Sequence, residues 1–404
     1  MTDAVRGGLG CAGRTRWRAG AAIVATALAT GGCTGEPQTF GELQRALQGR
    51  DSETQAALIE QLVKARGGTP LVEGRARLVF LARAVDGKAP RIVGDFNAWA
   101  STPSGHDPAA GVMTRLGDTD WHYLEASAFS NARLEYVLLF DIDARPDPLN
   151  PRTVEAYAGP RSEVRMPFWE PQWELEDADV PAGEVVGEAF VSRALGGTRR
   201  VWYYLPPGYD EGSGVLPSVF VLDGGNYVER MAVPRILDRL IARQAVPPLV
   251  AVFLEPVDRQ EEYSRNPRWR QFVTGELVPS VDARFRTFPG PERRVILGSS
   301  LAAYGAIDLA IEHPGVFGLV AALAPPAQTA TVISNQEHGR RHARSITFFV
   351  LGGTYDTSID GARRLRTALD DVNASVVYRE VPEGHSTETF RGRLDEALGA
   401  LLGR

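Results

Sequence analysis

The chain has 404 residues, of which 44% are hydrophobic and 23% charged, and its formal net charge is −6. This length predicts about two to three domains, and the composition argues against a largely disordered chain or one with many membrane spans. The acidic charge argues against a nucleic-acid-binding protein, and two cysteines, Cys11 and Cys33, are too few for a disulfide framework or a cysteine-rich metal site.

The first predicted segment is a secretion signal over residues 1–32. Three arginines between Arg14 and Arg18 form a basic region, and about a dozen small and apolar residues follow. This run is shorter than the roughly 20 residues that a membrane-spanning helix needs. Its end, Thr30-Gly31-Gly32-Cys33, resembles the lipobox of bacterial lipoproteins, with Thr30 where leucine is usual. We therefore expect an exported cell-envelope lipoprotein, periplasmic or at the surface, lipidated at Cys33; a plain signal peptide with an incidental cysteine is the alternative.

Residues 33–70 predict a polar linker and short helices. Thr39-Phe40-Gly41-Glu42 and Ser52-Glu53-Thr54-Gln55 both fit the capping box, which satisfies free N–H groups at a helix start. The second helix would carry an apolar face, and Gly67-Gly68 and Pro70 would end it. The face consists of Leu58, Ile59, Leu62 and Val63.

Residues 71–165 have the pattern of a small, immunoglobulin-like β-sandwich. Short apolar runs separated by turn residues such as Asp86-Gly87 predict strands. These strands are Arg75–Val85, Pro90–Gly94, Trp121–Ala126 and Arg133–Phe140. Proline continues neither strands nor helices, so the proline-rich stretches Pro146–Pro151 and Pro167–Trp173 indicate a domain boundary.

Residues 180–404 alternate between predicted strands and helices, which is typical of an α/β domain whose ligand site lies beyond the strand C-termini. Several inner strands are nearly all apolar, which indicates a parallel sheet covered on both faces. The strands are Val186–Ser192, Arg199–Leu205, Ser218–Leu222, Leu249–Leu254, Arg293–Leu297, Leu319–Ala324, Ile346–Leu351 and Ser375–Val381. The helices are Tyr227–Arg243, Gln271–Phe285, Ala302–His313, Asp360–Asp371 and Thr387–Leu402.

One strand–turn–helix junction has the form of a nucleophile elbow, G-x-S-x-G. Gly298-Ser299-Ser300-Leu301-Ala302 joins the strand Arg293–Leu297 to a predicted helix, with Ala302 in place of the last glycine. The pattern alone is weak, and a serine that caps a helix is the alternative. Its position between strand and helix favours Ser300 as a catalytic nucleophile.

A catalytic serine needs an imidazole base, and the imidazole needs a carboxylate that fixes its tautomer. In α/β-hydrolases the acid and then the histidine follow the serine along the chain. His385 directly follows the strand Ser375–Val381 and is the predicted base, with an exposed loop histidine as the alternative. Asp356 follows the strand Ile346–Leu351 and is the predicted acid. Asp360 is the reserve, although it fits a helix cap better.

Two backbone N–H groups would form the oxyanion hole. One is that of Leu301, at the start of the helix after the nucleophile. The other belongs to the loop Asp223-Gly224-Gly225-Asn226, where Gly225 is favoured over Gly224 and Asn226. A simple glycine turn is the alternative for this loop.

The order and spacing of several motifs over roughly Glu184–Arg404 resemble the putative-esterase family. This family includes enterochelin (ferric siderophore) esterases, esterase D, feruloyl and acetyl-xylan esterases, and mycolyltransferases. The motifs are Pro206-Pro207-Gly208-Tyr209, Leu222-Asp223-Gly224-Gly225, Glu276-Leu277-Val278-Pro279 within Arg259–Pro279, Gly298-Ser299-Ser300 and Gly384-His385. The resemblance implies an α/β-hydrolase fold and a serine carboxylesterase that works through an acyl-enzyme on Ser300, without metal or organic cofactor.

The N-terminal half also resembles the enterochelin-esterase arrangement. Gly68–Val72 fits this enterochelin-esterase arrangement. Arg91–Trp99 and Asp147–Asn150 are similar to isoamylase-type, glycogen-binding β-sandwich domains. In those domains aromatic residues stack on sugars, but packing within the sandwich is the favoured interpretation for Trp99.

Other features leave the substrate open. Arg259, Glu262 and Tyr263 match a family segment near the active-site mouth, where they would either position substrate or form a surface ion-pair cluster. Ala302-Ala303 and Leu323–Pro326 depart from the family pattern around the expected acyl pocket. The expected partner is a small-molecule or glycan ester. The alternatives are an acyltransferase or a feruloyl- or acetyl-xylan-type esterase on the same fold, and a non-catalytic carbohydrate- or siderophore-binding lipoprotein.

Overall fold

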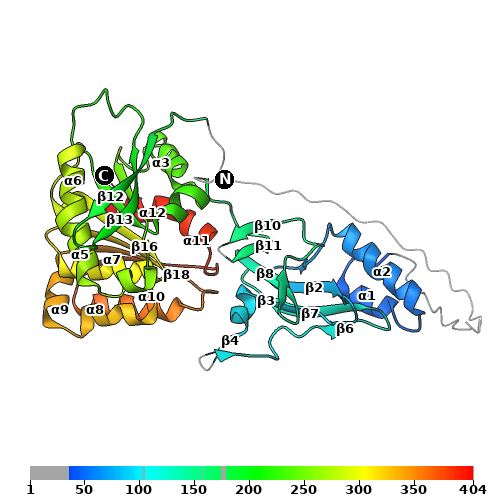
Figure 1. Cartoon of the computed structure of the whole chain (residues 1–404). Coiled ribbons are helices and arrows are strands. Elements are labelled where there is room, and N and C mark those ends of the chain that lie inside the picture. The colour runs from blue at the N-terminus through cyan, green and yellow to red at the C-terminus, as the bar shows by residue number, and fades with distance from the viewer. Residues whose placement is uncertain (1–35, 103–104, 157, 174–178, 404) are drawn as a thin grey trace, which may run out of the picture. The chain divides into compact units, whose positions relative to one another are not determined.

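The computed structural model describes residues 36–102, 105–156, 158–173 and 179–403 (Figure 1). The predicted export signal and Cys33 lie outside the described residues. None of the helices in those four ranges combines the length and the apolar character that a membrane span requires. Pro37–Arg404 forms one compact unit.

Two helices open this unit, and their caps differ from each other. In α1 (Phe40–Ala46) the predicted capping box is confirmed, because Thr39 and Glu42 each accept the other's backbone N–H. For α2 (Ser52–Ala65) the predicted box is wrong. Asp51 is the N-cap and accepts the N–H of Thr54 at 2.8 Å, while Gln55 donates to buried carbonyl groups instead. A carboxylate at this position also interacts favourably with the positive end of the helix dipole.

The predicted β-sandwich is present as two sheets. One has the order β1-β2-β7-β6, and the other β10-β11-β8-β3, with β9 paired to β8. The first sheet consists of β1 (Leu71–Glu73), β2 (Arg77–Arg83), β6 (Thr114–Arg115) and β7 (Trp121–Ser127). The second consists of β3 (Arg91–Gly94), β8 (Arg133–Phe140), β9 (Asp143–Arg145), β10 (Thr153–Ala156) and β11 (Gly159–Arg165). The sequence did not predict β10 and β11, because their polar residues lack the apolar alternation of a half-buried strand.

Both faces of β2 are buried, which explains its uninterrupted apolar run. Leu78 and Phe80 face the second sheet, in a core that includes Leu134 and Tyr136. Val79 and Leu81 face the opposite way and pack against the side chains of α1 and α2. The two helices therefore form a third layer over the first sheet (Figure 1).

Trp99 lies in a short 3-10 segment, Asp95–Ala100, that directly follows β3. Its indole N–H donates to Asp95 at 2.8 Å, and the Arg161 guanidinium lies 4.2 Å from the ring centroid. The ring is thus engaged within the sandwich, in agreement with the packing interpretation.

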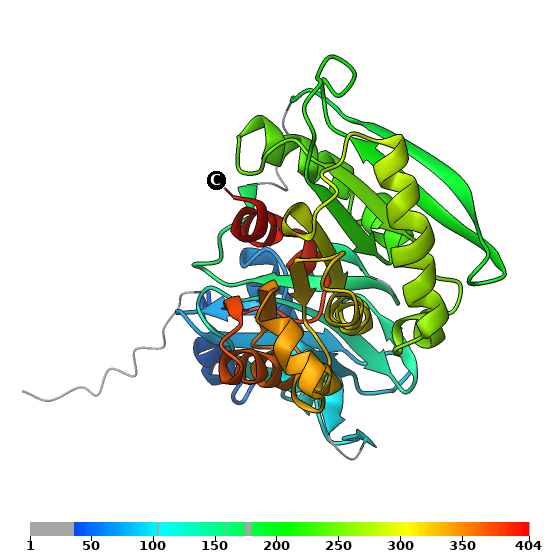
Figure 2. The same cartoon turned by 90° about the vertical axis from the view of Figure 1, so that its left-hand side faces the viewer.

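The α/β part contains one eight-stranded sheet in the order β12-β13-β15-β14-β16-β17-β18-β19. The pairs β12–β13 and β13–β15 are antiparallel and the others are parallel. Figure 2 shows the long β12–β13 hairpin at one edge of this sheet. The strands are β12 (Glu184–Ser192), β13 (Gly197–Leu205), β14 (Ser218–Leu222), β15 (Val250–Leu254), β16 (Arg294–Ser299), β17 (Leu319–Leu323), β18 (Thr347–Gly353) and β19 (Ser375–Val381). Each agrees with a predicted strand to within two residues at either end.

Helices cover both faces of the sheet, as the apolar strands predict. Alternate residues of β14 enter different cores: Phe220 packs with side chains of α6, α7 and α10, and Val221 with those of α3 and α12. These helices are α3 (Val233–Ala242), α6 (Val278–Arg284), α7 (Leu301–Glu312), α10 (Ile359–Asp371) and α12 (Leu394–Leu402). The shorter helices are α4 (Arg259–Tyr263), α5 (Pro267–Gln271), α8 (Ala330–Ser334), α9 (Glu337–Ala343) and α11 (Thr387–Arg391).

Two predicted helices are in fact interrupted. Tyr227–Arg243 is divided into a π-helical segment, Asn226–Arg230, and α3, because Ala232 adopts a left-handed conformation with φ of 50°. Thr387–Leu402 is divided into α11 and α12 at Gly392. A left-handed residue such as Ala232 ends a regular helical hydrogen-bond ladder.

Candidate active site

Ser300 occupies a strained turn between β16 and α7. Its φ of 56° and ψ of −126° lie far from the usual conformations of an L-residue. The surrounding structure holds this conformation, since the Ser300 N–H donates to the Leu323 carbonyl at 2.8 Å. Strain that persists in a well-packed segment is typical of functional sites.

Small residues make this turn possible. A Cβ atom at Gly298 would overlap the backbone of Ala302, one turn away, and Ala302 is itself completely buried. The structure therefore explains why glycine and alanine stand two residues before and two residues after Ser300.

We expect Gly298→Ala to lower the free energy of unfolding by about 1–3 kcal/mol, because the overlap forces the backbone of the turn apart. Chemical denaturation measures this change. Gly315→Ala is the matched control, since a Cβ at Gly315 meets no atom within 4 Å. Equal stability of the two variants would contradict the steric explanation.

His385 and Asp356 form a hydrogen-bonded pair. His385 follows β19, Asp356 follows β18, and His385 Nδ1 lies 2.8 Å from Asp356 Oδ2. The Asp356 side chain is 1% exposed and that of His385 is 35% exposed. Burial raises the pKa of Asp356, but the hydrogen bonds and charge of His385 and the bonds from Ser358 outweigh it and hold this pKa below its usual value. The aspartate is thus an ionised partner that orients the imidazole.

Ser358 is a member of this group that sequence reasoning missed. Its N–H and Oγ both bond Asp356 Oδ1, at 2.7 and 2.6 Å, and its Oγ lies 3.4 Å from His385 Nδ1. An aspartate side chain often accepts the backbone N–H two residues further on, and this turn pattern could have indicated residue 358 as a partner of Asp356. Asp360, the reserve acid, lies in the first turn of α10, where Ser358 and not Asp360 is the N-cap.

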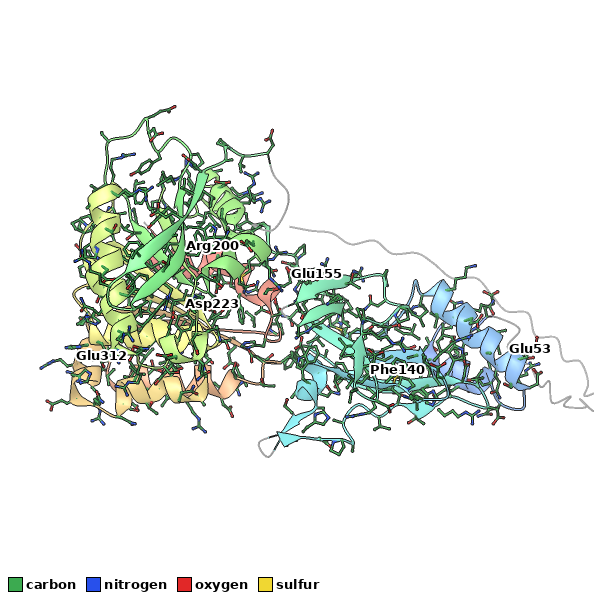
Figure 3. The ribbon with its side chains drawn as sticks, viewed as in Figure 1. Glu53, Phe140, Glu155, Arg200, Asp223 and Glu312 are labelled. Carbon is green, nitrogen blue, oxygen red and sulfur yellow. The ribbon has the colours of Figure 1, made fainter. Side chains whose placement is uncertain are left out.

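Ser300 and His385 line one cavity of about 520 Å³. Charged groups line it too, namely Asp223 (labelled in Figure 3) and Glu255, which directly follow β14 and β15, and Arg259, the first residue of α4. Arg161 and Ala156 of the sandwich also contribute, which the sequence did not reveal. Among the described residues, no group of three or more His, Cys, Asp or Glu side chains is arranged to hold a metal ion.

The two predicted oxyanion donors have different surroundings. Leu301 is the first residue of α7, where backbone N–H groups have no acceptor within the helix. The Gly225 N–H instead donates to Glu255 Oε2 at 2.5 Å. Burial raises the pKa of the Glu255 carboxyl, the Gly225 N–H lowers it, and the charges of Asp223 and Glu229 raise it, so the net shift is upward.

Asn226 and Gly224, the two alternative donors in this loop, also make other contacts. The Asn226 N–H donates to the Asp223 carbonyl at 3.0 Å. Gly224 packs so tightly against the β15 backbone that a Cβ would lie 2.6 Å from Leu254 N.

The three residues predicted to position substrate separate into two groups. Arg259 lines the cavity and donates to both carboxylate oxygens of Asp223, each at 2.9 Å. Glu262 is 4% exposed and pairs with Arg199 at 2.5 Å. Tyr263 is fully buried and accepts the Asp223 N–H at 2.9 Å. Only Arg259 of the three therefore reaches the cavity. Glu262 does form an ion pair, but this pair is buried, whereas the sequence suggested a cluster at the surface.

Residues 192–401 match the model of a family described as "Putative esterase". The iron(III) enterobactin esterase of Escherichia coli is 27% identical over 271 residues, which cover 62% of this chain and 66% of that protein, just under two thirds. The enzyme of the same name from Dickeya dadantii is 26% identical over 403 residues, covering 84% of this chain and 91% of the relative.

Solved structures show the same fold. Ferric enterobactin esterase from Salmonella typhimurium matches with a TM-score of 0.70 and 21% identity, over 85% of this chain and 98% of that one. The Shigella flexneri enterobactin esterase, crystallised in the presence of enterobactin, has a TM-score of 0.66, 21% identity and coverage of 85% and 97%. The resemblance to enterochelin esterases and the α/β-hydrolase fold are thereby confirmed.

Proposed function

The chain belongs to the putative-esterase family, and on that premise we propose that it is a serine carboxylic-ester hydrolase of the enterobactin-esterase type. The observation that carries the proposal is the His385–Asp356 pair at 2.8 Å, with His385 and the strained Ser300 lining one cavity. The names of the relatives suggest an iron-siderophore ester as substrate.

The geometry supports an acyl-enzyme mechanism. With Nδ1 donating to Asp356, the Nε2 of His385 is free to take the proton of Ser300 as Oγ attacks the ester carbonyl carbon. The helix N-terminus at Leu301 stabilises the negative oxygen that develops. Collapse of the tetrahedral intermediate that this attack forms breaks the ester C–O bond, and His385 gives its proton to the leaving alcohol. Water, deprotonated by His385, then attacks the acyl carbon, and His385 returns this proton to Ser300 Oγ as the bond between Oγ and the acid breaks.

A substrate panel tests this proposal. The wild-type protein is given ferric and iron-free catecholate siderophore triesters, feruloyl and acetyl-xylan esters, and a short p-nitrophenyl ester, and released acid is measured. Preferential hydrolysis of the siderophore esters supports the proposal. Transfer of the acyl group to an added sugar in preference to water would favour the acyltransferase alternative, and binding without hydrolysis the non-catalytic one.

Gly225 can complete the oxyanion hole only after Glu255 releases its N–H. We therefore expect Glu255→Ala to raise kcat/KM for a small neutral ester at neutral pH by up to about tenfold, because it frees a donor and removes a negative charge near the developing oxyanion. Steady-state kinetics measure this change, with Glu211→Ala as the control, since Glu211 is exposed and does not line the cavity. A large loss of activity would instead show that Glu255 takes a direct part in binding or catalysis.

We also propose that the protein is exported and lipidated at Cys33. The basic, apolar and small-residue pattern of residues 14–33 supports this. Mass spectrometry of the N-terminal peptide of the cell-derived protein is expected to find a diacylglyceryl group on Cys33, and Cys33→Ser is expected to release the protein from membranes. An unmodified Cys33, or a chain that retains residues 1–32, would overturn the proposal.

A further inference from the structure

The loop that carries Asp356 is bonded to the β-sandwich. The hydroxyl oxygen of Tyr355, the residue next to Asp356, accepts the N–H of Phe129 at 2.8 Å. The two rings also meet edge to face, with centroids 5.7 Å apart. Phe129 lies in the turn between β7 and β8, so one end of the sandwich contacts the residue that immediately precedes the acid of the catalytic pair.

The loop that carries His385 is bonded to the same end of the sandwich. The Arg133 N–H donates to the Pro382 carbonyl at 3.2 Å, and its Nη1 donates to Ser386 Oγ at 3.2 Å. Arg133 is 2% exposed and is itself held by Glu163 at 2.5 Å and Glu135 at 3.0 Å. Arg133 therefore holds the loop on both sides of His385, through its backbone N–H at Pro382 and through its fixed guanidinium at Ser386.

The residue that immediately precedes His385 is in contact with a buried sandwich carboxylate. A Cβ at Gly384 would overlap the carboxylate of Asp95. Asp95 is 4% exposed and accepts the Glu135 N–H at 2.7 Å and the Trp99 indole N–H at 2.8 Å. These two bonds fix the carboxylate, and the carboxylate sets how closely Gly384 approaches the sandwich.

The α/β part alone holds this loop at other points. The Tyr355 N–H donates to the Glu383 carbonyl at 3.1 Å, and Thr389 Oγ1 donates to the Gly384 carbonyl at 3.0 Å. Arg393 pairs with Glu383 at 2.6 Å. These contacts shape the loop, whereas the contacts to Arg133 and Asp95 fix residues 382, 384 and 386 against a second rigid element.

We infer that the β-sandwich is a positioning element of the catalytic site, acting on the His385–Asp356 pair through Arg133 and Asp95 on one loop and through the Phe129–Tyr355 bond on the other. The inference rests on the proposed function and extends it to residues that touch neither substrate nor reacting atoms. A displacement of about 1 Å in such a pair is enough to lower turnover by as much as a hundredfold.

Three substitutions in the full chain test the inference. Tyr355→Phe removes only the hydroxyl that accepts the Phe129 N–H, Asp95→Asn keeps the shape of the carboxylate, and Arg133→Lys keeps the charge. Asp147→Asn is the matched control. It is also a buried sandwich carboxylate, 2% exposed, but its partners are Thr69, Tyr136 and Leu149 and not the catalytic loops.

We expect each of the three variants to lower kcat for a short p-nitrophenyl ester by about tenfold or more, with KM within twofold of wild type. Asp147→Asn is expected to lower the melting temperature but to leave kcat unchanged. A second readout does not need turnover, namely the low-field proton NMR signal of the His385 Nδ1–H bonded to Asp356. This signal should shift or broaden in the three variants and stay in place in Asp147→Asn.

Tyr355→Phe and Asp95→Asn are the decisive tests of the positioning role. Arg133→Lys also removes part of a buried ion network and is the variant that most disrupts the fold. Folded variants with wild-type kcat and an unchanged NMR signal would overturn the inference, as would an equal loss in Asp147→Asn. If the wild-type protein shows no turnover, the proposed function fails by itself. In that case the NMR signal still tests whether the sandwich positions the His385–Asp356 pair.

Discussion

Replacing Ser300 by alanine is expected to lower kcat for ester hydrolysis by about 10⁴- to 10⁶-fold while the protein stays folded. The substitution removes the only atom that forms the acyl bond, but substrate binding and the helix N-terminus at Leu301 remain. Hydrolysis of a p-nitrophenyl ester and covalent labelling by a fluorophosphonate probe measure the effect, and both should be lost together.

A matched serine is available as a control for this experiment. Ser218 is completely buried at the start of β14, and its Oγ lacks a hydrogen-bond partner within the described part of the chain. Ser218→Ala therefore removes a hydroxyl from the same sheet at the opposite end of its strands, and it should keep full activity. Turnover that survives in Ser300→Ala would disprove the assignment of the nucleophile.

The second large effect is expected for Asp356→Asn, which should lower kcat by about 10⁴-fold. An asparagine amide can donate to Nδ1 of His385, which would place the imidazole proton on Nε2 and remove its ability to act as a base. KM should change little, because the Asp356 side chain is buried behind His385 and does not line the cavity. Steady-state kinetics separate the two quantities.

Asp360→Asn is the control for this second substitution, since Asp360 is the other acidic residue that the sequence offered for the role. It lies in the first turn of α10, and the variant should retain wild-type turnover. The opposite result, an active Asp356→Asn and an inactive Asp360→Asn, would transfer the role of the acid to Asp360.

The sequence predicted the sheet well because its inner strands, such as β14, β15 and β17, are almost wholly apolar, and it placed candidate residues by their position after strands. Ser300, Asp356 and His385 follow β16, β18 and β19, and the structure brings His385 and Asp356 into hydrogen-bond contact. Such positions can be read from a linear pattern, since parallel strands end at one edge of a sheet.

Other parts of the site depend on contacts that no linear pattern contains. Arg133 and Ser386 are 253 positions apart, and Gly225 and Glu255 are 30 apart, yet each pair is hydrogen bonded. The polar strand β11, which supplies Arg161 to the cavity, lacks apolar alternation. Such residues are specified by how separate elements pack, and their local sequence resembles that of an ordinary surface.

The burial of both faces of β2 has a practical consequence for producing the protein in shortened form. A chain that begins at residue 71, where the sandwich pattern starts, would lack α1 and α2 and would leave Val79, Leu81 and Trp121 facing water. Exposed apolar strands of this kind promote aggregation. A soluble fragment must therefore begin before Phe40, so that the two helices ahead of the sandwich are retained as part of the fold.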